Sequence, residues 1–355
     1  MTGIWWEYLA VFSATATMCV VLTPWAIRLA FRRSLLDHPG GHKSHNVAIP
    51  YLGGVTIATT FALMVVVISL LWPPNSGLGE LLVVLAAAVF LALVGFVDDM
   101  RQVSPLWRIV AEVVAAVAIW SAGTGVIVTT SEPLNMGLTV LWFVGITNAF
   151  NLLDNMDGLA TGIAAIASLT TFAIATTNGQ FLVAGLAVGL AGCTVGFLRH
   201  NFHPARIYMG DGGSLFIGFL VAYLCIKLRF QGGRLLSGLV PVLVCSVAIF
   251  DTTLVTVSRL ATGRSPFLGG QDHASHRLVH LGLPVPIAVG TIYLGAIGIG
   301  ILTYVVSGTD PRSAWVLTTM IGATLTAVGG YLLTVPVYTG APANHRSPDT
   351  VSRDD

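Results

Sequence analysis

The chain has 355 residues, of which 55% are hydrophobic and only 9% are charged, and its formal net charge is +1. Because soluble domains carry about one quarter charged residues, this composition excludes a water-soluble protein. The four cysteines lie in apolar runs without C-x-x-C spacing, which indicates neither a disulfide framework nor a zinc site. The sequence therefore predicts a single helical membrane domain.

Apolar runs of roughly the 20 residues needed to cross a bilayer recur along the chain. They begin near Glu7, Tyr51, Gly79, Trp107, Gly137, Leu159, Gln180, Ser214, Leu235, Val285 and Ser313. Because they are continuously apolar rather than alternating, they favour helices over a β-barrel. We expect an all-α, polytopic integral membrane protein with about eleven transmembrane helices in residues 1–335. Residues 336–355, rich in Pro, Ser and Asp, are expected to form a disordered cytoplasmic tail.

Basic residues are concentrated in one set of alternate loops, and such loops face the cytoplasm. This set carries Arg32, Arg33, Lys43, Arg101, Arg108, Arg199, Arg206, Arg264 and Arg277. The opposite loops are short and nearly uncharged, with Lys227, Arg229 and Arg234 as a local exception. This distribution predicts an N-terminus outside and a C-terminus in the cytoplasm.

Carboxylates gather on the same basic face, although a charged side chain at membrane depth costs about 2.5 to 3.5 kcal/mol. Asp98 and Asp99 end the third run in GFVDDM, and Asp154 and Asp157 end the fifth in NAFNLLDNMDGLA. An isolated Asp pair is also typical of a solvated helix cap. Four carboxylates at one face favour a functional site.

A polar stripe precedes the second acidic pair. Asn148, Asn151 and Asp154 are spaced by three residues, so a helix places them along one side. Such a stripe lines a cavity or supplies hydrogen bonds between helices. Glu112 and Asp251, inside other apolar runs, have the same two interpretations, and the sequence does not decide between them.

The loop RHNFHPARIYMGDGGS indicates phosphate binding. Its glycines leave backbone N–H groups open where a helix starts, and such positions bind anions, although a tight turn with a helix cap fits them too. Asp211 among these glycines would repel a phosphate unless Mg²⁺ joined the two. A later loop, SPFLGGQDHASHRL, supplies His273, His276 and Arg277, which are suited to contact a diphosphate.

Together these segments resemble the polyprenyl-phosphate N-acetylhexosamine-1-phosphate transferases, which include the translocase that makes the first lipid intermediate of peptidoglycan. The resemblance covers nearly the whole chain and rests on LDHPGGHKSHNVAIPYLGG, GFVDDM, NAFNLLDNMDGLA, NFHPARIYMGDGGS and SPFLGGQDHASHRL. It implies a Mg²⁺-dependent exchange, with Mn²⁺ as an alternative cation. A polyprenyl phosphate attacks a UDP-sugar, and UMP leaves.

The resemblance also implies roles for residues. Asp98 and Asp99 match the catalytic acidic pair, and Asp211 and Asp157 match metal ligands. The matched substrate-binding positions are Lys43, Asp154, Asn201, Tyr208, His273 and His276. We also expect substrate contacts from His45, Asn148, Asn151, Arg264 and Arg277. The expected partners are the UDP-sugar, the polyprenyl phosphate and the bilayer of a bacterial inner membrane. No nucleic acid is expected, and a homodimer is one option for an oligomeric state that the sequence leaves open.

Three departures from the family pattern bear on the substrate. His42 stands before Lys43 where the signature usually has Arg, and the histidine loop reads His273, Ala274, Ser275, His276 rather than H-x-H-H. The stretch IPYLGG lacks the PTMGG form of the peptidoglycan translocase. The last difference favours a donor such as UDP-GlcNAc over the muramyl pentapeptide.

Two other classes of protein compete with the enzyme. A transporter uses intramembrane carboxylates near the bilayer midplane, whereas the carboxylates here lie at one face, and no pair of interrupted spans indicates inverted repeats. A non-catalytic membrane scaffold would use the polar clusters as hydrogen bonds between helices.

Overall fold

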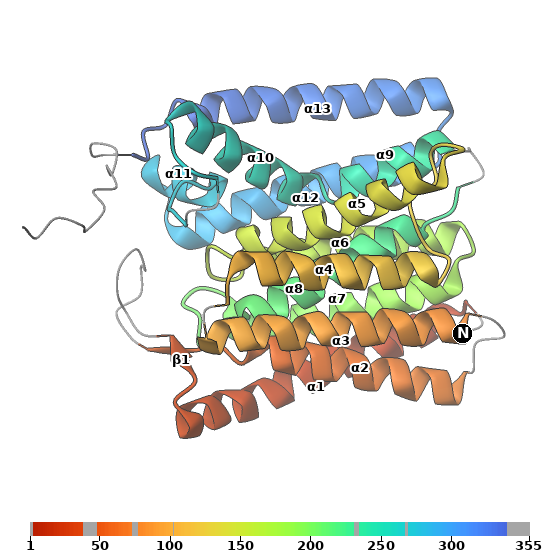
Figure 1. The fold of residues 1–355 in the computed structure, drawn as a ribbon, viewed down its shortest axis with the longest axis horizontal. Helices are drawn as coiled ribbons and strands as arrows, with labels where there is room; N and C mark the ends of the chain where they lie inside the picture. Colours follow the sequence, from red (N-terminus) through yellow and green to blue (C-terminus); the bar gives the residue numbers. More distant parts are fainter. Residues whose placement is uncertain are drawn as a thin grey trace, which may run out of the picture.

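The computed structural model describes residues 3–37, 48–72, 77–101, 103–230, 234–266 and 269–338. In these residues the chain forms long helices that run side by side, with one small sheet at an end of the bundle (Figure 1). The elements are α1 (Trp5–Arg33), β1 (Leu36–Asp37), β2 (Ile49–Pro50), α2 (Gly53–Leu71), α3 (Leu78–Arg101), α4 (Pro105–Ser121), α5 (Glu132–Leu153), α6 (Leu159–Thr177), α7 (Phe181–Asn201), α8 (Gly210–Lys227), α9 (Arg234–Val244), α10 (Ser246–Ala261), α11 (Ala274–His280), α12 (Val285–Ser307) and α13 (Pro311–Leu333).

The all-α, polytopic membrane fold is confirmed, whereas the count of about eleven spans stays a prediction. In the described residues nine helices are long and apolar enough to cross a membrane, or ten if the bent pair α9 and α10 is one span. That pair bends by 69° where Val244 and Ser246 flank the break. The remaining expected run became α4, whose 17 residues reach only about 25 Å at 1.5 Å per residue.

Helix α8 lies at the centre of the bundle and packs against α3, α5 and α2. In its most apolar window 83% of the residues are buried, against 17% in α12 and in α13. Glycines allow backbones to touch at its first turn. A Cβ added to Gly95 would lie 2.4 Å from the backbone carbon of Asp211, and one on Gly54 would lie 2.3 Å from the nitrogen of Gly213. Helices α2 and α3 therefore fix the start of α8 in place.

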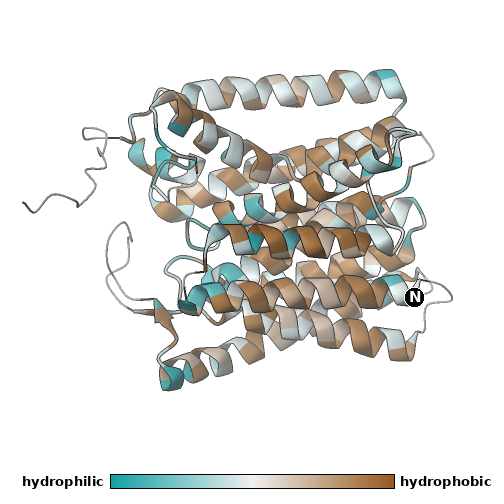
Figure 2. Cartoon of the chain, in the orientation of Figure 1, coloured by the Kyte–Doolittle hydropathy of each residue, from teal (hydrophilic) through white to brown (hydrophobic). Residues whose placement is uncertain are grey.

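Polar residues concentrate at the two ends of the bundle, while its length is largely hydrophobic (Figure 2). The end that carries β1 and α11 also holds the last turn of α1 and the end of α13, and α1 begins at the opposite end (Figure 1). The loops predicted to share the basic face do meet there. For example, Tyr208 N–H, between α7 and α8, donates to Pro50 O in β2 at 2.7 Å.

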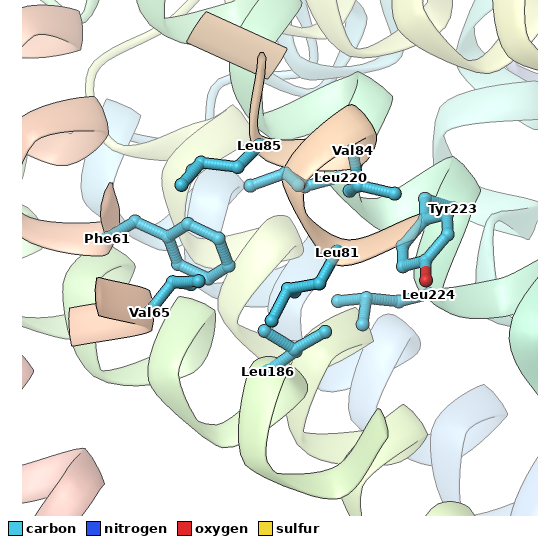
Figure 3. Close-up of a pocket in the computed structure, with 9 residues that line it drawn as sticks. All are labelled: Phe61, Val65, Leu81, Val84, Leu85, Leu186, Leu220, Tyr223 and Leu224. Atoms are coloured by element: carbon cyan, nitrogen blue, oxygen red, sulfur yellow. The ribbon is translucent and has the colours of Figure 1, made fainter. Parts of the chain in front are cut away.

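At the opposite end the exceptional basic residue Lys227 has an acidic partner. Its Nζ lies 2.6 Å from Oε1 of Glu80, and the hydroxyl of Tyr223 donates to the same carboxylate at 2.9 Å. This pairing offsets the positive charge on a face that was expected to lack it. Next to this cluster a small apolar cavity lies between α2, α3, α7 and α8, with Phe61 and Leu220 among its lining residues (Figure 3).

The described part of the chain ends three residues after the expected domain boundary at residue 335. The hydroxyl of Tyr338 donates to Oδ2 of Asp272 at 2.5 Å, and the guanidinium of Arg264 lies 4.2 Å above the Tyr338 ring. The segment after α13 is thus attached to the loop that precedes α11. The rest of the expected tail lies outside the described residues.

Candidate active site

Two carboxylates from distant parts of the sequence meet at one arginine. Arg108, in the first turn of α4, donates from Nη1 to Asp98 Oδ2 at 2.9 Å and to Asp211 Oδ2 at 2.7 Å. Asp98 is 8% exposed, whereas the Asp211 side chain is 32% exposed. The backbone N–H of Val103 fixes the other Asp98 oxygen at 2.6 Å. The two aspartates therefore point toward a single positive group, and Asp211 is the more accessible of the two.

Asp99 occupies the N-terminus of α8. Its Oδ1 accepts the N–H of Asp211 at 2.9 Å, and its Oδ2 accepts the N–H of Gly212 at 3.3 Å. The sequence had predicted that these glycine-rich N–H groups stay open for a phosphate. That expectation was wrong for these two groups, because the close approach of α3 at Gly95 brings the Asp99 carboxylate onto them. A carboxylate at this position is also stabilised by the helix dipole.

The polar stripe on α5 reaches the same cluster. Asn151 donates from Nδ2 to Asp211 Oδ1 at 2.8 Å and to Ser214 Oγ at 2.9 Å. Asp154 follows immediately after α5, and in the described residues no hydrogen bond to its carboxylate is present. Burial, and then the charges of Asp211 and Asp157, raise its pKa to about 7. Asp154 is therefore a carboxylate available to a cation or a donor group.

Asp157 lies across from the loop between α7 and α8. Its Oδ2 lies 2.9 Å from His203 Nδ1 and accepts the N–H of Ala205 at 3.0 Å. Tyr208 lies close enough that the Asp157 charge, after burial, raises the pKa of its phenol. Asp157 thus holds the loop that carries Tyr208, and its assignment as a metal ligand stays a prediction.

Two residues that were expected to contact the substrate direct their side chains into the protein instead. Asn201 is 2% exposed; its Nδ2 donates to Ile207 O at 3.0 Å and its Oδ1 accepts from Thr161 at 2.8 Å. Asn148 donates to Glu112 on α4 and to Val144 O. Glu112 is therefore a partner between helices, one of the two interpretations that the sequence left open.

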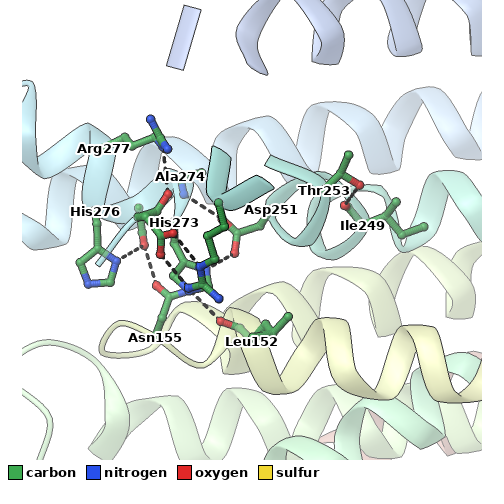
Figure 4. A network of polar contacts seen from close by, with 12 residues as sticks. Leu152, Asn155, Ile249, Asp251, Thr253, His273, Ala274, His276 and Arg277 are labelled. Atoms are coloured by element: carbon green, nitrogen blue, oxygen red, sulfur yellow. Dashed lines mark hydrogen bonds and ion pairs between the residues drawn. The ribbon is translucent and has the colours of Figure 1, made fainter. Parts of the chain in front are cut away.

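The histidine loop is held by Asp251, whose role the sequence did not settle. Asp251 Oδ2 lies 2.7 Å from His273 Nδ1, and Oδ1 accepts the N–H of Ala274 at 2.8 Å (Figure 4). Asp251 is 2% exposed and His273 4% exposed. Both carboxylate oxygens thus fix the start of α11. Nε2 is the ring nitrogen of His273 that Asp251 does not contact.

The neighbouring residues connect this loop to the acidic cluster. Ser275 donates to Asn155 Oδ1 at 2.6 Å, and Asn155 directly follows Asp154. His276 lies beside them, with its ring centroid 5.9 Å from that of His273 (Figure 4). Burial, and then the neighbouring His273, lower the pKa of His276 to about 4. His276 is consequently neutral at pH 7 and able to donate from one nitrogen and accept at the other.

Arg277, in contrast, is an internal anchor. It is 1% exposed, and four of its five N–H groups are used within the protein. They reach Asp272 O, Ser258 Oγ and the carbonyls of Leu332 and Val335 near the end of α13. Arg264 packs on Tyr338, as described above. Lys43 and His45 lie outside the described residues.

The chemistry of the cluster fits a hard divalent cation. In the described residues no three His, Cys, Asp or Glu side chains form a complete metal site. Mg²⁺ does not require one, because it is commonly held by one or two carboxylates, water and substrate phosphates. Asp98 and Asp211 already direct oxygens at one positive group, the guanidinium of Arg108. The residues present therefore match the oxygen ligands that such a cation prefers.

Arg108 is the site residue that sequence reasoning missed, since it was used only to orient the helices. Its signal was available: it lies nine residues after Asp99, at the start of the next helix on the same face. Asn155 and Ser275 were also missed. The only hint was their position beside residues already selected, Asp154 and His276.

The fold and the site define a polytopic membrane protein with a cluster of carboxylates at one end of its helical bundle. Residues 81–229, from α3 to the end of α8, match the model of glycosyl transferase family 4. The chain belongs to this family. Its match contains Asp98, Asp99, Asp154 and Asp211, whereas the histidine loop lies beyond it.

Curated relatives agree over most of the chain. It is 32% identical to a probable undecaprenyl-phosphate N-acetylglucosaminyl 1-phosphate transferase of Bacillus subtilis, over 80% of each protein. It is 31% identical to a decaprenyl-phosphate N-acetylglucosaminephosphotransferase of Mycolicibacterium smegmatis, over 98% of this chain and 91% of the relative. A phospho-N-acetylmuramoyl-pentapeptide-transferase of Bacillus velezensis is 28% identical, over 76% of this chain and 87% of the relative.

Proposed function

We propose that the protein transfers N-acetylhexosamine-1-phosphate from a UDP-sugar to undecaprenyl or decaprenyl phosphate and releases UMP. The favoured donor is UDP-GlcNAc. The reaction takes place at the cytoplasmic face of a bacterial inner membrane and starts a cell-envelope glycan. One observation carries the proposal: Asp98 and Asp211 converge on one positive group, beside Asp99, at the end of the bundle that collects the basic loops. The names of the relatives support the donor and the acceptor.

Asp211, assisted by Asp98, would hold Mg²⁺, or Mn²⁺ in its place. When bound, the cation supplies positive charge that neutralises the donor diphosphate and polarises its phosphorus. Asn151 orients Asp211 through the 2.8 Å hydrogen bond to Oδ1. In this proposal Asp154, whose pKa is raised in part by the charge of Asp211, contributes to the side of the site that binds the uridine and its phosphates. Asp157 and Tyr208 then form the side of the site that faces the uridine.

In the reaction an oxygen of the polyprenyl phosphate forms a bond to the β-phosphorus of the UDP-sugar. The bond from that phosphorus to the bridging oxygen breaks, and UMP leaves. The acceptor phosphate has a second pKa near 6, so it is largely ionised at neutral pH and requires no strong base. Positioning and charge neutralisation supply most of the catalysis in phosphoryl transfer. Asp99, fixed on α8, serves to position the acceptor rather than to remove a proton.

The acceptor reaches the site from the bilayer. The first turn of helix α4 contains Leu106 and Trp107, each 66% exposed, directly before Arg108 in the acidic cluster. Exposed apolar side chains at this point face lipid, as expected for a membrane helix. This arrangement supports delivery of a prenyl chain along α4 and of its phosphate to Asp98 and Asp99.

In this proposal the histidine loop contacts the sugar phosphate. His276 is neutral, as its lowered pKa requires, and it contributes hydrogen bonds rather than charge. His273 is oriented by Asp251. In this proposal Arg277, Asn201 and Asn148 position the site without touching the substrate, because their polar groups already bond within the protein.

Replacing Asp251 tests this division of roles. In Asp251→Asn one oxygen becomes an NH₂ group that opposes either His273 Nδ1–H or the Ala274 N–H. We expect kcat to fall by about tenfold to 100-fold, with the Mg²⁺ concentration for half-maximal rate unchanged. The matched control is Thr253→Ala, on the same helix, whose hydroxyl donates to Ile249 O (Figure 4). A shift in Mg²⁺ dependence in Asp251→Asn would place Asp251 at the cation instead.

Two alternatives differ in substrate or class. The muramyl pentapeptide donor is supported by the Bacillus velezensis relative, but two relatives of higher identity are named for N-acetylglucosamine. A transporter is disfavoured because the main carboxylate cluster lies at one end of the bundle, and because the relatives are named as transferases.

The decisive assay supplies purified protein with Mg²⁺, polyprenyl phosphate and single UDP-sugars, and measures UMP. We expect UMP from UDP-GlcNAc and none when the polyprenyl phosphate is omitted. UMP from UDP-MurNAc-pentapeptide alone would assign the peptidoglycan reaction. Substrate uptake into sealed vesicles without UMP formation would support the transporter.

A further inference from the structure

Arg108 occupies the place where the proposed function requires a cation. Its Nη1 lies 2.9 Å from Asp98 Oδ2 and 2.7 Å from Asp211 Oδ2. A guanidinium remains charged at any physiological pH, so it offsets part of the negative charge of these two carboxylates in the protein without substrate. A divalent cation that uses the same two oxygens must displace it.

A second observation shows where the guanidinium can go. Glu112 lies four residues after Arg108, and residues at this spacing are neighbours on a helix surface. Glu112 is 1% exposed; its Oε2 accepts from Asn148, but Oε1 has no hydrogen-bond partner in the described part of the chain. The Nε of Arg108 is likewise buried without a partner there. A buried donor and a buried acceptor on adjacent turns are thus both unsatisfied, which is costly for each.

We infer that Arg108 is a built-in substitute for the divalent cation, and that it moves from Asp98 and Asp211 to Glu112 when the cation binds. The inference rests on the proposed cation site. In the metal-free state Arg108 prevents repulsion between the two aspartates. In the loaded state the Arg108–Glu112 pair satisfies Glu112 Oε1. A positive group therefore faces Asp98 and Asp211 in both states.

This exchange makes metal affinity depend on Arg108 and Glu112 in opposite directions. Removal of Arg108 eliminates a competitor for the Asp211 oxygens. Removal of the Glu112 charge eliminates the acceptor that receives Arg108. The guanidinium that the metal displaces then has no carboxylate to pair with. Glu112 matters only through Arg108, and the two effects are therefore not additive, as expected for residues that share one interaction.

The test titrates Mn²⁺ into the purified full-length chain in detergent, without nucleotide, and follows free Mn²⁺ by electron paramagnetic resonance. Relative to the unsubstituted protein, Arg108→Gln is expected to bind Mn²⁺ about tenfold more tightly, and Glu112→Gln about threefold to tenfold more weakly. In the Arg108→Gln background, adding Glu112→Gln is expected to change the affinity by less than about twofold. Asp310→Asn, which removes an exposed carboxylate at the start of α13, is the control and is expected to have no effect.

Two results would overturn the inference. One is Mn²⁺ binding to Arg108→Gln that is no tighter than to the unsubstituted protein, with elution volume and melting temperature showing that the variant is folded. The other is a loss of affinity from Glu112→Gln that is equal in both backgrounds, because that result is expected from charge alone.

The assay of UMP release separates this inference from the proposed function. We expect Glu112→Gln to raise the Mg²⁺ concentration for half-maximal rate while kcat at saturating Mg²⁺ is retained. If UMP is formed but the Mn²⁺ affinities fail the double-mutant test, only the inference is lost. If no UMP forms from any donor while the affinities behave as stated, the transferase proposal is lost and the exchange of Arg108 stands. If the unsubstituted protein binds no Mn²⁺, the inference is wrong.

Discussion

Asp211→Asn is expected to reduce UMP release by at least about 100-fold to 1000-fold, the range found when a group that stabilises transition-state charge is removed. Asp211 is the more exposed of the two carboxylates at Arg108, and Asn151 orients it from the other side. An amide of the same shape keeps one acceptor oxygen but carries no charge for the cation. Any residual rate should depend less steeply on Mg²⁺. Single-turnover UMP release across a Mg²⁺ titration measures both effects.

The matched control for this prediction is again Asp310→Asn, because Asp310 caps α13 at the opposite end of the bundle by accepting from the backbone N–H groups of Arg312 and Ser313. Asn is an equally good cap residue, so the rate should not change. Near-normal turnover of Asp211→Asn, in protein that elutes as the unsubstituted chain does, would refute the assignment of Asp211 to the cation.

Asp99→Asn is expected to lower the rate by about 100-fold through a different mechanism. The two Asp99 oxygens accept the N–H groups of Asp211 and Gly212. In the amide variant one of these acceptors becomes a donor that faces a donor, and the first turn of α8 shifts. Loss of a helix cap costs about 0.5 to 2 kcal/mol, so the protein should remain folded with a modestly lower melting temperature.

The dependence on Mg²⁺ distinguishes the two aspartates. For Asp99→Asn we expect a lower rate and a higher KM for the polyprenyl phosphate, with little change in the Mg²⁺ concentration for half-maximal rate. If Asp99→Asn instead behaved as Asp211→Asn does in the same titration, Asp99 would belong to the cation site. An unchanged KM for the acceptor would remove its role in placing the lipid phosphate.

Sequence reasoning performed best where physical constraints act on whole segments. A long apolar run has to become a helix in lipid because its backbone groups have no other partners, and the basic loops divide the helix ends into two sets. These two constraints together place Asp98, Asp99, Asp154 and Asp211 at one end. The sequence did not predict the break between α9 and α10 or the short length of α4. A local bend or a missing turn hardly changes the composition of a segment.

The contacts of single polar side chains were harder to predict from the sequence. Asn201 was selected through a resemblance in sequence and Arg277 from its place in the histidine loop, yet Thr161, Ile207 and the end of α13 take their hydrogen bonds. Asp251 and Glu112 were left open, and their partners lie on other elements, at His273 and Asn148. Spacing along one helix predicts which side a residue lies on, but the partner depends on how a second helix is rotated and how closely it approaches.

The sequence by itself determined the membrane fold, the end of the bundle at which the carboxylates gather and the oxygen chemistry that they offer. The tertiary structure alone decided that Asp99 closes the N-terminus of α8 and that Arg108 stands between Asp98 and Asp211. The physical reason is that hydrophobic burial and loop charge act on many residues at once and are visible as averages. A contact between two side chains depends instead on backbone approaches of a few ångströms, such as that of Gly95 to Asp211, which only the packed helices fix.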